Sequence, residues 1–285
     1  VALFLTLASA DAELKESLSV ESPALNGPMK YSLFLPEAQS ARLPVLYLLH
    51  GLGGHERDWQ ALGHIAQTAT RLIRQNAIPP MAIVMPDGAN SWYVNSEKHG
   101  LYEDALLEDL IPETERTHGF GGDRSRRAIA GLSMGGYGAF RLAFRYPDRF
   151  AMTAGLSAAI FPDLEAAEDV SRQQIGFFKG VFGEPFDVAE FNRQNFFSDI
   201  PSLMAIDERP AIFWLPEPSN PRSVDEHQIQ LKQLIIFGQR PVTAHDLDHL
   251  AAVIEQERRI ESVVVAAQTV IVCMFRNVTH HLLLL

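Results

Sequence analysis

Residues 127–145 read RAIAGLSMGGYGAFRLAFR, and this stretch decides the fold. It begins with a short apolar run, Ala128-Ile129-Ala130, which is typical of a buried strand. After the glycine-rich centre, apolar residues recur at helical spacing until Pro147 stops the pattern. The stretch therefore predicts a strand that turns sharply into a helix, with Ser133 at the turn.

The centre of this stretch is Gly131-Leu132-Ser133-Met134-Gly135, which matches the pattern G-x-S-x-G. On a strand-to-helix turn, this pattern holds a serine nucleophile in a tight backbone conformation, so the flanking residues must be small to avoid a clash. The turn also raises the serine hydroxyl above the carboxyl edge of the sheet. The helix that follows offers backbone N–H groups and positive potential to a developing oxyanion. A chance match is the alternative, but the strand–turn–helix context favours a nucleophilic role for Ser133.

The composition limits both the size of the core and the range of partners. The chain has 285 residues, of which 47% are hydrophobic, enough to bury the core of one large α/β domain or two small ones. The formal net charge is −11 and no basic cluster occurs, so nucleic acid and anionic membranes are not expected partners. The single cysteine, Cys273, excludes an intramolecular disulfide and a cysteine-based metal site. No apolar run is long enough to span a bilayer, and no metal or cofactor is implied.

Strand-like and helix-like segments alternate along the first half of the chain. Continuous apolar runs at 44–50, 81–86 and 150–157 predict strands that are buried on both faces. Residues 58–74 and 102–116 have helical spacing instead. This alternation predicts a mostly parallel central sheet with helices on both faces.

The flanking segments follow other patterns. Residues 18–36 alternate loosely, which predicts antiparallel strands at the edge of the sheet. Residues 158–209 hold eight phenylalanines and no clear strand, and we interpret them as a helical insertion near the active site, a lid or a pocket wall. For most of these phenylalanines a plain core position is the better interpretation. Two more strands are predicted at 211–215 and 234–237, and a helix at 244–260.

Six segments together have the pattern of a known family. They are PVLYLLHGLGG at 44–54, DW at 58–59, MPDG at 85–88, SWY at 91–93, YEDALLEDLIP at 102–112 and RRAIAGLSMGGYGAFRLAFRYPDRF at 126–150. They resemble the esterase D family of α/β-hydrolases, which includes S-formylglutathione hydrolases, feruloyl and acetylxylan esterases, and the antigen 85 mycolyltransferases. The resemblance is dense from about residue 18 to residue 156 and poor after about Trp214. It implies an α/β-hydrolase fold.

The resemblance also implies that two backbone N–H groups form an oxyanion hole. One belongs to Met134, directly after the nucleophile, and the other comes from the His-Gly-Leu turn, where Leu52 is the best match. Two donors must meet where the carbonyl oxygen becomes negative. Aromatic residues on loops expected beside the nucleophile are predicted to bind the substrate. They are Trp59, Trp92 and Tyr93.

The catalytic base is expected downstream of Ser133, because the triad order in this fold is Ser…Asp/Glu…His. His245 is the best candidate, since it follows a predicted strand and begins a predicted helix. The family usually has Gly-His-Asp-Trp at such a place, and this chain has Ala-His-Asp-Leu. His249, one turn later, is the second candidate, and His50 is a rival base that the triad order disfavours.

The catalytic acid is where the chain departs most from the family pattern. The family places an aspartate in a Gly-x-x-Asp turn just after the strand that holds Trp214, and this chain has no such motif there. Asp225 and Glu217 are the carboxylates within reach, and direct counting puts Asn220 near the expected position. A carboxylate is needed to fix the tautomer of the base and to stabilise the imidazolium. We take Asp225 as the catalytic acid and Glu217 as the second candidate.

The two ends of the chain carry separate expectations. Residues 1–10 are an apolar run that ends in Ala-Ser-Ala, typical of the back half of a secretory signal peptide with cleavage before Asp11, and an ordinary buried segment is the alternative. Residues 11–260 are assigned to the α/β-hydrolase domain, and 261–285 form an atypical C-terminal tail with a strong β run. The tail is either an extra edge strand or the result of a shifted or truncated coding sequence.

These patterns predict a secreted or periplasmic serine carboxylesterase that acts through an acyl-enzyme. The expected substrates are small-molecule or polysaccharide-linked esters of the feruloyl or acetylxylan kind. The alternatives within the family are an S-formylglutathione hydrolase and an acyltransferase. Outside that class, the alternative is a non-catalytic relative with an incomplete triad.

Overall fold

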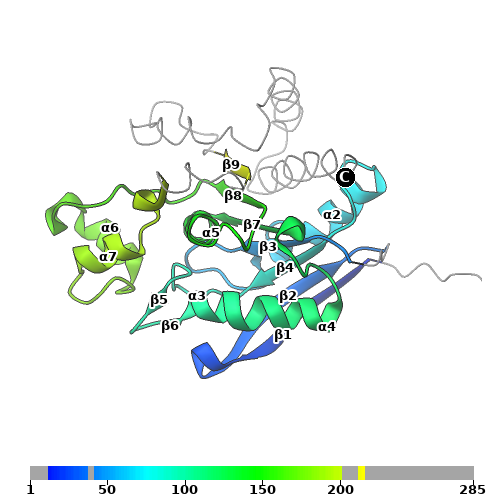
Figure 1. The fold of residues 1–285 in the computed structure, drawn as a ribbon, viewed down its shortest axis with the longest axis horizontal. Helices are drawn as coiled ribbons and strands as arrows, with labels where there is room; N and C mark the ends of the chain where they lie inside the picture. The colour runs from blue at the N-terminus through cyan, green and yellow to red at the C-terminus, as the bar shows by residue number, and fades with distance from the viewer. Residues whose placement is uncertain (1–11, 38–41, 201–210, 216–285) are drawn as a thin grey trace, which may run out of the picture.

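The computed structural model of the chain describes residues 12–37, 42–200 and 211–215. Within these ranges, seven strands form one sheet in the order β1-β2-β4-β3-β7-β8-β9 (Figure 1). β1, β2 and β4 pair antiparallel, and every pair from β4 to β9 is parallel. The strands are β1 (Glu13–Ser22), β2 (Gly27–Leu35), β3 (Val45–Leu49), β4 (Ala82–Pro86), β7 (Arg127–Leu132), β8 (Met152–Leu156) and β9 (Ala211–Leu215). The predicted antiparallel edge and mostly parallel sheet are confirmed.

The inner strands are buried on both faces, as their continuous apolar runs predict. In β3, Val45, Tyr47 and Leu49 belong to one apolar cluster, whereas Leu46 and Leu48 belong to the other, because side chains alternate across a sheet. The first cluster includes side chains of residues 102–118 and of α5 (Met134–Arg145), and the second includes side chains of α1 (Asp58–Ala61) and α2 (Ile65–Arg74). Helices therefore cover both faces of the sheet, as expected for an α/β-hydrolase.

Two predicted helices are less regular than their sequence pattern. The segment 58–74 is broken between α1 and α2, where His64 has a φ of 46°. The segment that starts at residue 102 contains a π-helical turn, which coincides with the missing N–H of Pro112. Its three parts are α3 (Tyr102–Asp104), η2 (Ala105–Leu110) and α4 (Ile111–His118).

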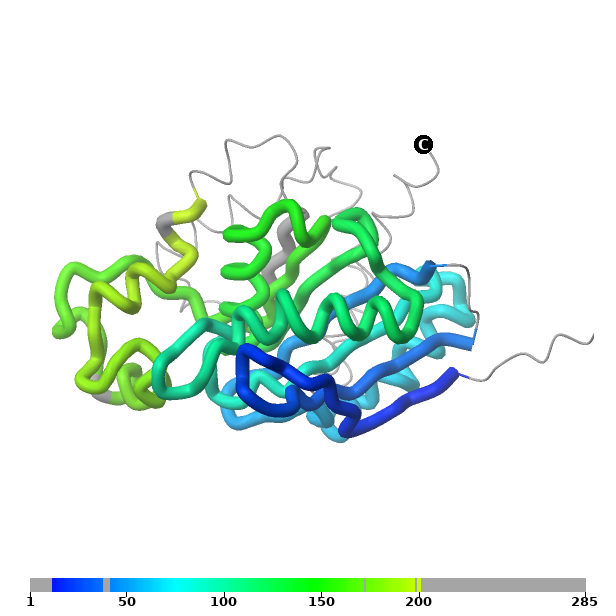
Figure 2. Tube along the Cα trace, turned by 60° about the horizontal axis from the view of Figure 1, so that its bottom comes forward, coloured from blue at the N-terminus to red at the C-terminus, as the bar shows by residue number. Residues whose placement is uncertain are grey.

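The predicted insertion forms a lobe at one end of the molecule, next to the short strands β5 (Asn95–Ser96) and β6 (Gly100–Leu101) (Figures 1 and 2). Its described part contains α6 (Arg172–Phe178) and α7 (Val188–Gln194) and no strand, so the helical prediction is confirmed there. Most of its phenylalanines are core residues, as expected. Phe178, Phe182, Phe191 and Phe196 are buried, Phe161 and Phe186 are half-buried against the same core cluster, and Phe177 is exposed.

Several predicted features lie outside the described residues. They are the signal-like residues 1–10, the strand at 234–237, the helix at 244–260 and the tail at 261–285. The strand predicted at 211–215 is present as β9. Among the residues that the structure describes, no helix has the length and apolar character needed to cross a membrane.

Candidate active site

Ser133 lies at the tight turn between β7 and α5, at the carboxyl edge of the sheet. Figure 1 labels both elements. Its φ of 53° and ψ of −111° are sterically unfavourable for a residue with a side chain. Three backbone hydrogen bonds hold this conformation. The Ser133 N–H donates to Leu156 O at 2.9 Å, and the Ser133 carbonyl accepts from Tyr137 N at 3.0 Å and Ala159 N at 3.1 Å. The strained turn presents a partly exposed serine, which is the predicted arrangement of a nucleophile.

Two glycines make this turn possible through close backbone approach. A Cβ on Gly131 would stand 2.3 Å from the carbonyl carbon of Gly135, and a Cβ on Gly135 would stand 2.5 Å from Leu49 O. Neither distance is compatible with any side chain. The small residues of the G-x-S-x-G pattern therefore allow the first turn of α5 to pack directly against the ends of β3 and β7.

The structure brings the two predicted oxyanion donors to the same end of the sheet. Met134 is the first residue of α5, so its N–H has no partner within the helix. A Cβ on Gly51 would lie 3.8 Å from the Cβ of Ser133, which places the Gly51–Leu52 peptide next to the nucleophile. The turn closes through a hydrogen bond from Gly54 N to Gly51 O at 3.1 Å.

His50 is a buried residue whose two ring nitrogens are both engaged. The Gly88 N–H donates to Nε2 at 2.9 Å, so Nε2 is an acceptor, and Nδ1 must then carry the proton that it shares with Gly51 O at 2.8 Å. A base needs a free lone pair beside the nucleophile, and the Nε2 lone pair of His50 already accepts from Gly88 N–H. The structure therefore gives His50 a positioning role and removes it as a rival base.

The orientation of the Gly51–Leu52 peptide follows from these bonds. Its carbonyl accepts from His50 Nδ1 and from Gly54 N. In a trans peptide the N–H points opposite to the carbonyl, so the Leu52 N–H is turned away from the His50 ring. Asn90 Oδ1 fixes the same loop further by accepting from Gly53 N at 2.8 Å. The loop after β4 thus holds the predicted oxyanion donor in place.

The aromatic residues predicted to bind substrate are buried in the described structure, and their substrate contact stays a prediction. Trp59, Trp92 and Tyr93 are 4%, 3% and 0% exposed. Trp92 packs against four rings of α5 and the insertion, and its Nε1 donates to Phe177 O at 3.3 Å. Burial raises the pKa of Tyr93 well above its usual range, so its hydroxyl stays protonated and donates to His50 O at 3.1 Å. Trp59 lies in α1, and Trp92 and Tyr93 lie on the loop after β4, where their rings pack within the protein.

The residues predicted to complete the triad lie outside the described residues. They are His245, its alternative His249, and the acid candidates Asp225, Glu217 and Asn220. Their roles remain predictions. In the described ranges, no group of three or more histidine, aspartate, glutamate or cysteine side chains is arranged to hold a metal ion.

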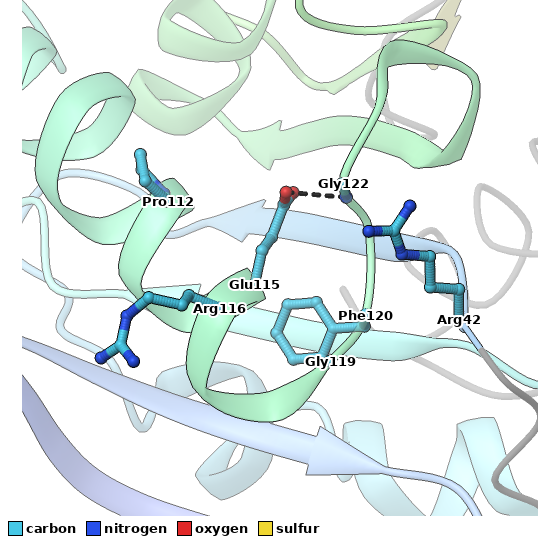
Figure 3. A pocket seen from close by; sticks show the side chains of 7 residues that line it. All are labelled: Arg42, Pro112, Glu115, Arg116, Gly119, Phe120 and Gly122. Atoms are coloured by element: carbon cyan, nitrogen blue, oxygen red, sulfur yellow. Dashed lines mark hydrogen bonds between the residues drawn. The ribbon is translucent and has the colours of Figure 1, made fainter.

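A cavity of about 360 Å³ lies away from this site. Figure 3 shows its lining residues Arg42, Pro112, Glu115, Arg116, Gly119, Phe120 and Gly122. Glu115, which lines the cavity, accepts from Arg127 Nη2 at 2.7 Å. Arg127 is the first residue of β7, and Ser133 comes directly after the last residue of the same strand. The cavity is therefore at the opposite end of the sheet from the nucleophile.

We predict that His50→Leu lowers kcat about 10²-fold and leaves KM nearly unchanged, because the Leu52 N–H loses its anchor and removal of one oxyanion donor costs about 10²–10³ in rate. The check is steady-state kinetics on p-nitrophenyl acetate. His55→Leu, at an exposed position on the same loop, is the control and should keep the wild-type rate. A wild-type kcat in His50→Leu would contradict the positioning role.

The sheet order and the serine turn define an α/β-hydrolase. A family model described as "Putative esterase" matches residues 22–264, and the chain belongs to this esterase family. It is 32% identical over 128 residues to an acetyl esterase of Caldicellulosiruptor saccharolyticus, across 45% of this chain and 46% of that protein. It is 26% identical over 182 residues to an S-formylglutathione hydrolase of Paracoccus denitrificans, across 56% of this chain and 61% of that protein.

A solved ferulic acid esterase has the same fold. It superposes with a TM-score of 0.54 at 28% identity, across 70% of this chain and 73% of that chain. The chain spans less than two thirds of the length of both the acetyl esterase and the S-formylglutathione hydrolase. The resemblance to the esterase D family that the sequence predicted is confirmed.

Proposed function

We propose that this protein is a serine carboxylesterase that works through a covalent acyl-enzyme at Ser133. The observation that carries the proposal is the strained serine turn, with the N–H of Met134 at the start of α5 and the Gly51–Leu52 peptide beside the serine. A nucleophile and two aligned donors are what acyl transfer from an ester requires. The esterase family supports the same reaction class.

The proposed reaction has two halves. Ser133 Oγ attacks the ester carbonyl while His245 takes the hydroxyl proton, and the carbonyl oxygen becomes negative between the N–H groups of Leu52 and Met134. Collapse of this intermediate breaks the ester C–O bond, and His245 returns the proton to the leaving alcohol. Water then enters, is deprotonated by the same histidine, and releases the carboxylic acid. Asp225 orients His245 in this proposal.

We propose extracellular esters as the substrates, with acetyl or feruloyl groups as the acyl part. The support comes from the acetyl esterase and ferulic acid esterase relatives and from the signal-like residues 1–10. S-formylglutathione is a cytosolic thioester, so a secreted protein would not meet it. No nucleic acid partner, metal or cofactor enters the mechanism.

The experiment that tests the proposal is a pre-steady-state assay with p-nitrophenyl acetate. An acyl-enzyme mechanism gives a burst of p-nitrophenol equal to the concentration of active protein, followed by slower turnover. Acetyl, feruloyl and palmitoyl esters and S-formylglutathione are then compared by kcat/KM. We expect acetyl or feruloyl esters to lead, and a clear preference for palmitoyl esters or S-formylglutathione would overturn the substrate class.

We predict that activity rises with pH through one ionisation near ~6.5, the ordinary value for a histidine side chain. The base must be neutral to accept the serine proton, so the protonated form below this pH is inactive. The measurement is kcat/KM on p-nitrophenyl acetate between pH 5 and pH 9, with buffer-only hydrolysis subtracted at each pH. A flat profile across this range would rule out a histidine base.

A further inference from the structure

The nucleophile helix α5 is enclosed on all sides. Every residue from Met134 to Phe144 is buried, although a helix on the face of a sheet normally exposes one side. Residues near the end of the insertion pack against α5. Phe196 packs its ring against Tyr137, Phe140 and Phe144 at centroid distances of 5.4, 6.0 and 5.5 Å.

A charged residue lies within this apolar contact. Arg141, two turns after Ser133, is 1% exposed. Its Nη1 donates to the buried carboxylate of Glu103, its Nε donates to Gln194 O at 2.6 Å, and its Nη2 donates to Gln194 Oε1. The Tyr137 hydroxyl donates to the same Gln194 carbonyl at 3.1 Å. Arg141 therefore ties α5 to the last residue of α7 and to α3.

The other oxygen of Glu103 is also satisfied. The Tyr146 hydroxyl donates to it, and burial together with the carboxylate raises the pKa of Tyr146 to about 12, so this phenol stays a donor. A buried ion pair whose groups are all hydrogen-bonded fixes one geometry, because any shift leaves a charge unpaired in an apolar surround. Stacked phenylalanines alone do not impose such a single arrangement.

α7 and the residue that follows it hold the segment after β8, which lies beside Ser133. Residues 157–164, which we call the strap, follow β8, and Ala159 N donates to Ser133 O at 3.1 Å. Asn195 Nδ2 donates to Phe161 O at 3.0 Å, and the Asn192 side chain donates to Leu164 O at 2.8 Å and accepts from Leu164 N at 2.9 Å.

These contacts form a closed circuit. It runs from Ser133 along the strap to α7, from α7 through Gln194 to Arg141, and from Arg141 along α5 back to Ser133. All eight strap residues are half-buried, and the stretch Ala158-Ala159-Ile160-Phe161 is apolar. The strap therefore places partly exposed apolar residues, packed on the core and held by directional bonds, at the sheet edge where Ser133 lies.

We propose that the strap is the acyl-binding wall of the site, and that Arg141 is a positioning residue that sets acyl selectivity by fixing this wall. The proposal rests on the proposed esterase function. A large acyl group needs the wall in one place, whereas an acetyl group reaches Ser133 and the oxyanion donors without it. Loss of the guanidinium should therefore lower kcat/KM for esters with a large acyl group much more than kcat/KM for acetyl esters.

The test compares Arg141→Met with Arg149→Met, which removes the same charge from an exposed pair with Glu108. Hydrolysis of p-nitrophenyl acetate and of methyl ferulate is measured for both variants. In Arg141→Met we expect kcat/KM for the ferulate to fall at least about tenfold and that for the acetate less than about threefold. Arg149→Met should match the wild type on both esters. Arg141→Lys keeps the charge but not the planar fork, so it should restore part of the ferulate rate.

Limited chymotrypsin digestion gives a readout that does not depend on activity. Arg141→Met should be cleaved within residues 157–200 at enzyme doses that leave the wild type and Arg149→Met intact. If Arg141→Met does not fold, Gln194→Met replaces it, since this change removes the side-chain acceptor and leaves the ion pair with Glu103.

The outcomes separate the two proposals. An equal loss on both esters, no loss on either, or unchanged proteolysis would each overturn the role of Arg141. A wild type that gives no burst with p-nitrophenyl acetate would overturn the esterase proposal instead, and the proteolysis result would still decide whether Arg141 fixes the strap.

Discussion

Ser133→Ala abolishes ester hydrolysis in our account and leaves the fold intact. The hydroxyl is the only group at the turn that can attack a carbonyl, and loss of a triad nucleophile typically costs about 10⁴–10⁶ in kcat. Stability should change little, because alanine and serine are similarly disfavoured at a φ of 53° and the backbone bonds of the turn do not involve the hydroxyl. The measurement is the rate on p-nitrophenyl acetate together with the thermal midpoint.

The control for this variant is Ser125→Ala, an exposed serine near the other end of β7 whose hydroxyl donates to Asp123. It should keep the wild-type rate. If Ser133→Ala retains more than about a tenth of the wild-type rate, the assignment of the nucleophile is wrong. A loss of the thermal transition would show instead that the turn itself depends on the serine.

The second large effect is expected at the acid. Asp225→Asn should leave KM nearly unchanged and lower kcat about 10⁴-fold, because the amide no longer holds His245 in the tautomer that accepts the serine proton. The matched variant is Glu217→Gln, which should have little effect. Both are measured on the same ester at a pH above the ionisation of the base.

Any other combination of results would assign the role of catalytic acid to a different residue. A large loss in Glu217→Gln and none in Asp225→Asn would assign the acid to Glu217, whose longer side chain reaches further. If both variants keep the wild-type rate, Asn220 is the remaining candidate, since an amide oxygen orients the histidine in cysteine proteases. His245→Ala should then abolish activity, and a wild-type rate there would remove the base and with it the triad.

Local patterns predicted most of the sheet and the turn. The apolar runs at 44–50 and 81–86 gave β3 and β4, because a strand buried on both faces needs apolar side chains at every position. The G-x-S-x-G pattern located Ser133. The tight turn requires glycines at fixed positions beside the serine, and residues so close in the chain form a pattern that the sequence shows directly. The break at His64 was not predicted, since a single left-handed residue leaves the helical spacing on either side unchanged.

The parts that the sequence did not reveal depend on partners far apart in the chain. The role of His50 rests on Gly88, 38 residues away, and that of Arg141 on Glu103 and Gln194, 38 and 53 residues away. A charged residue within the apolar pattern of α5 was the available signal for Arg141, because a buried charge requires a partner. No spacing rule identifies that partner before the chain is folded.

The most direct test of the central claim is to identify the residue that carries the acyl group. The protein is mixed with p-nitrophenyl acetate, quenched in acid during the burst, and digested with trypsin, which releases residues 128–141 as one peptide. We expect an acetyl group on Ser133, the only serine in that peptide, and no acetyl group on the same peptide of Ser133→Ala. Ester hydrolysis with no acetyl group on this peptide would contradict the account.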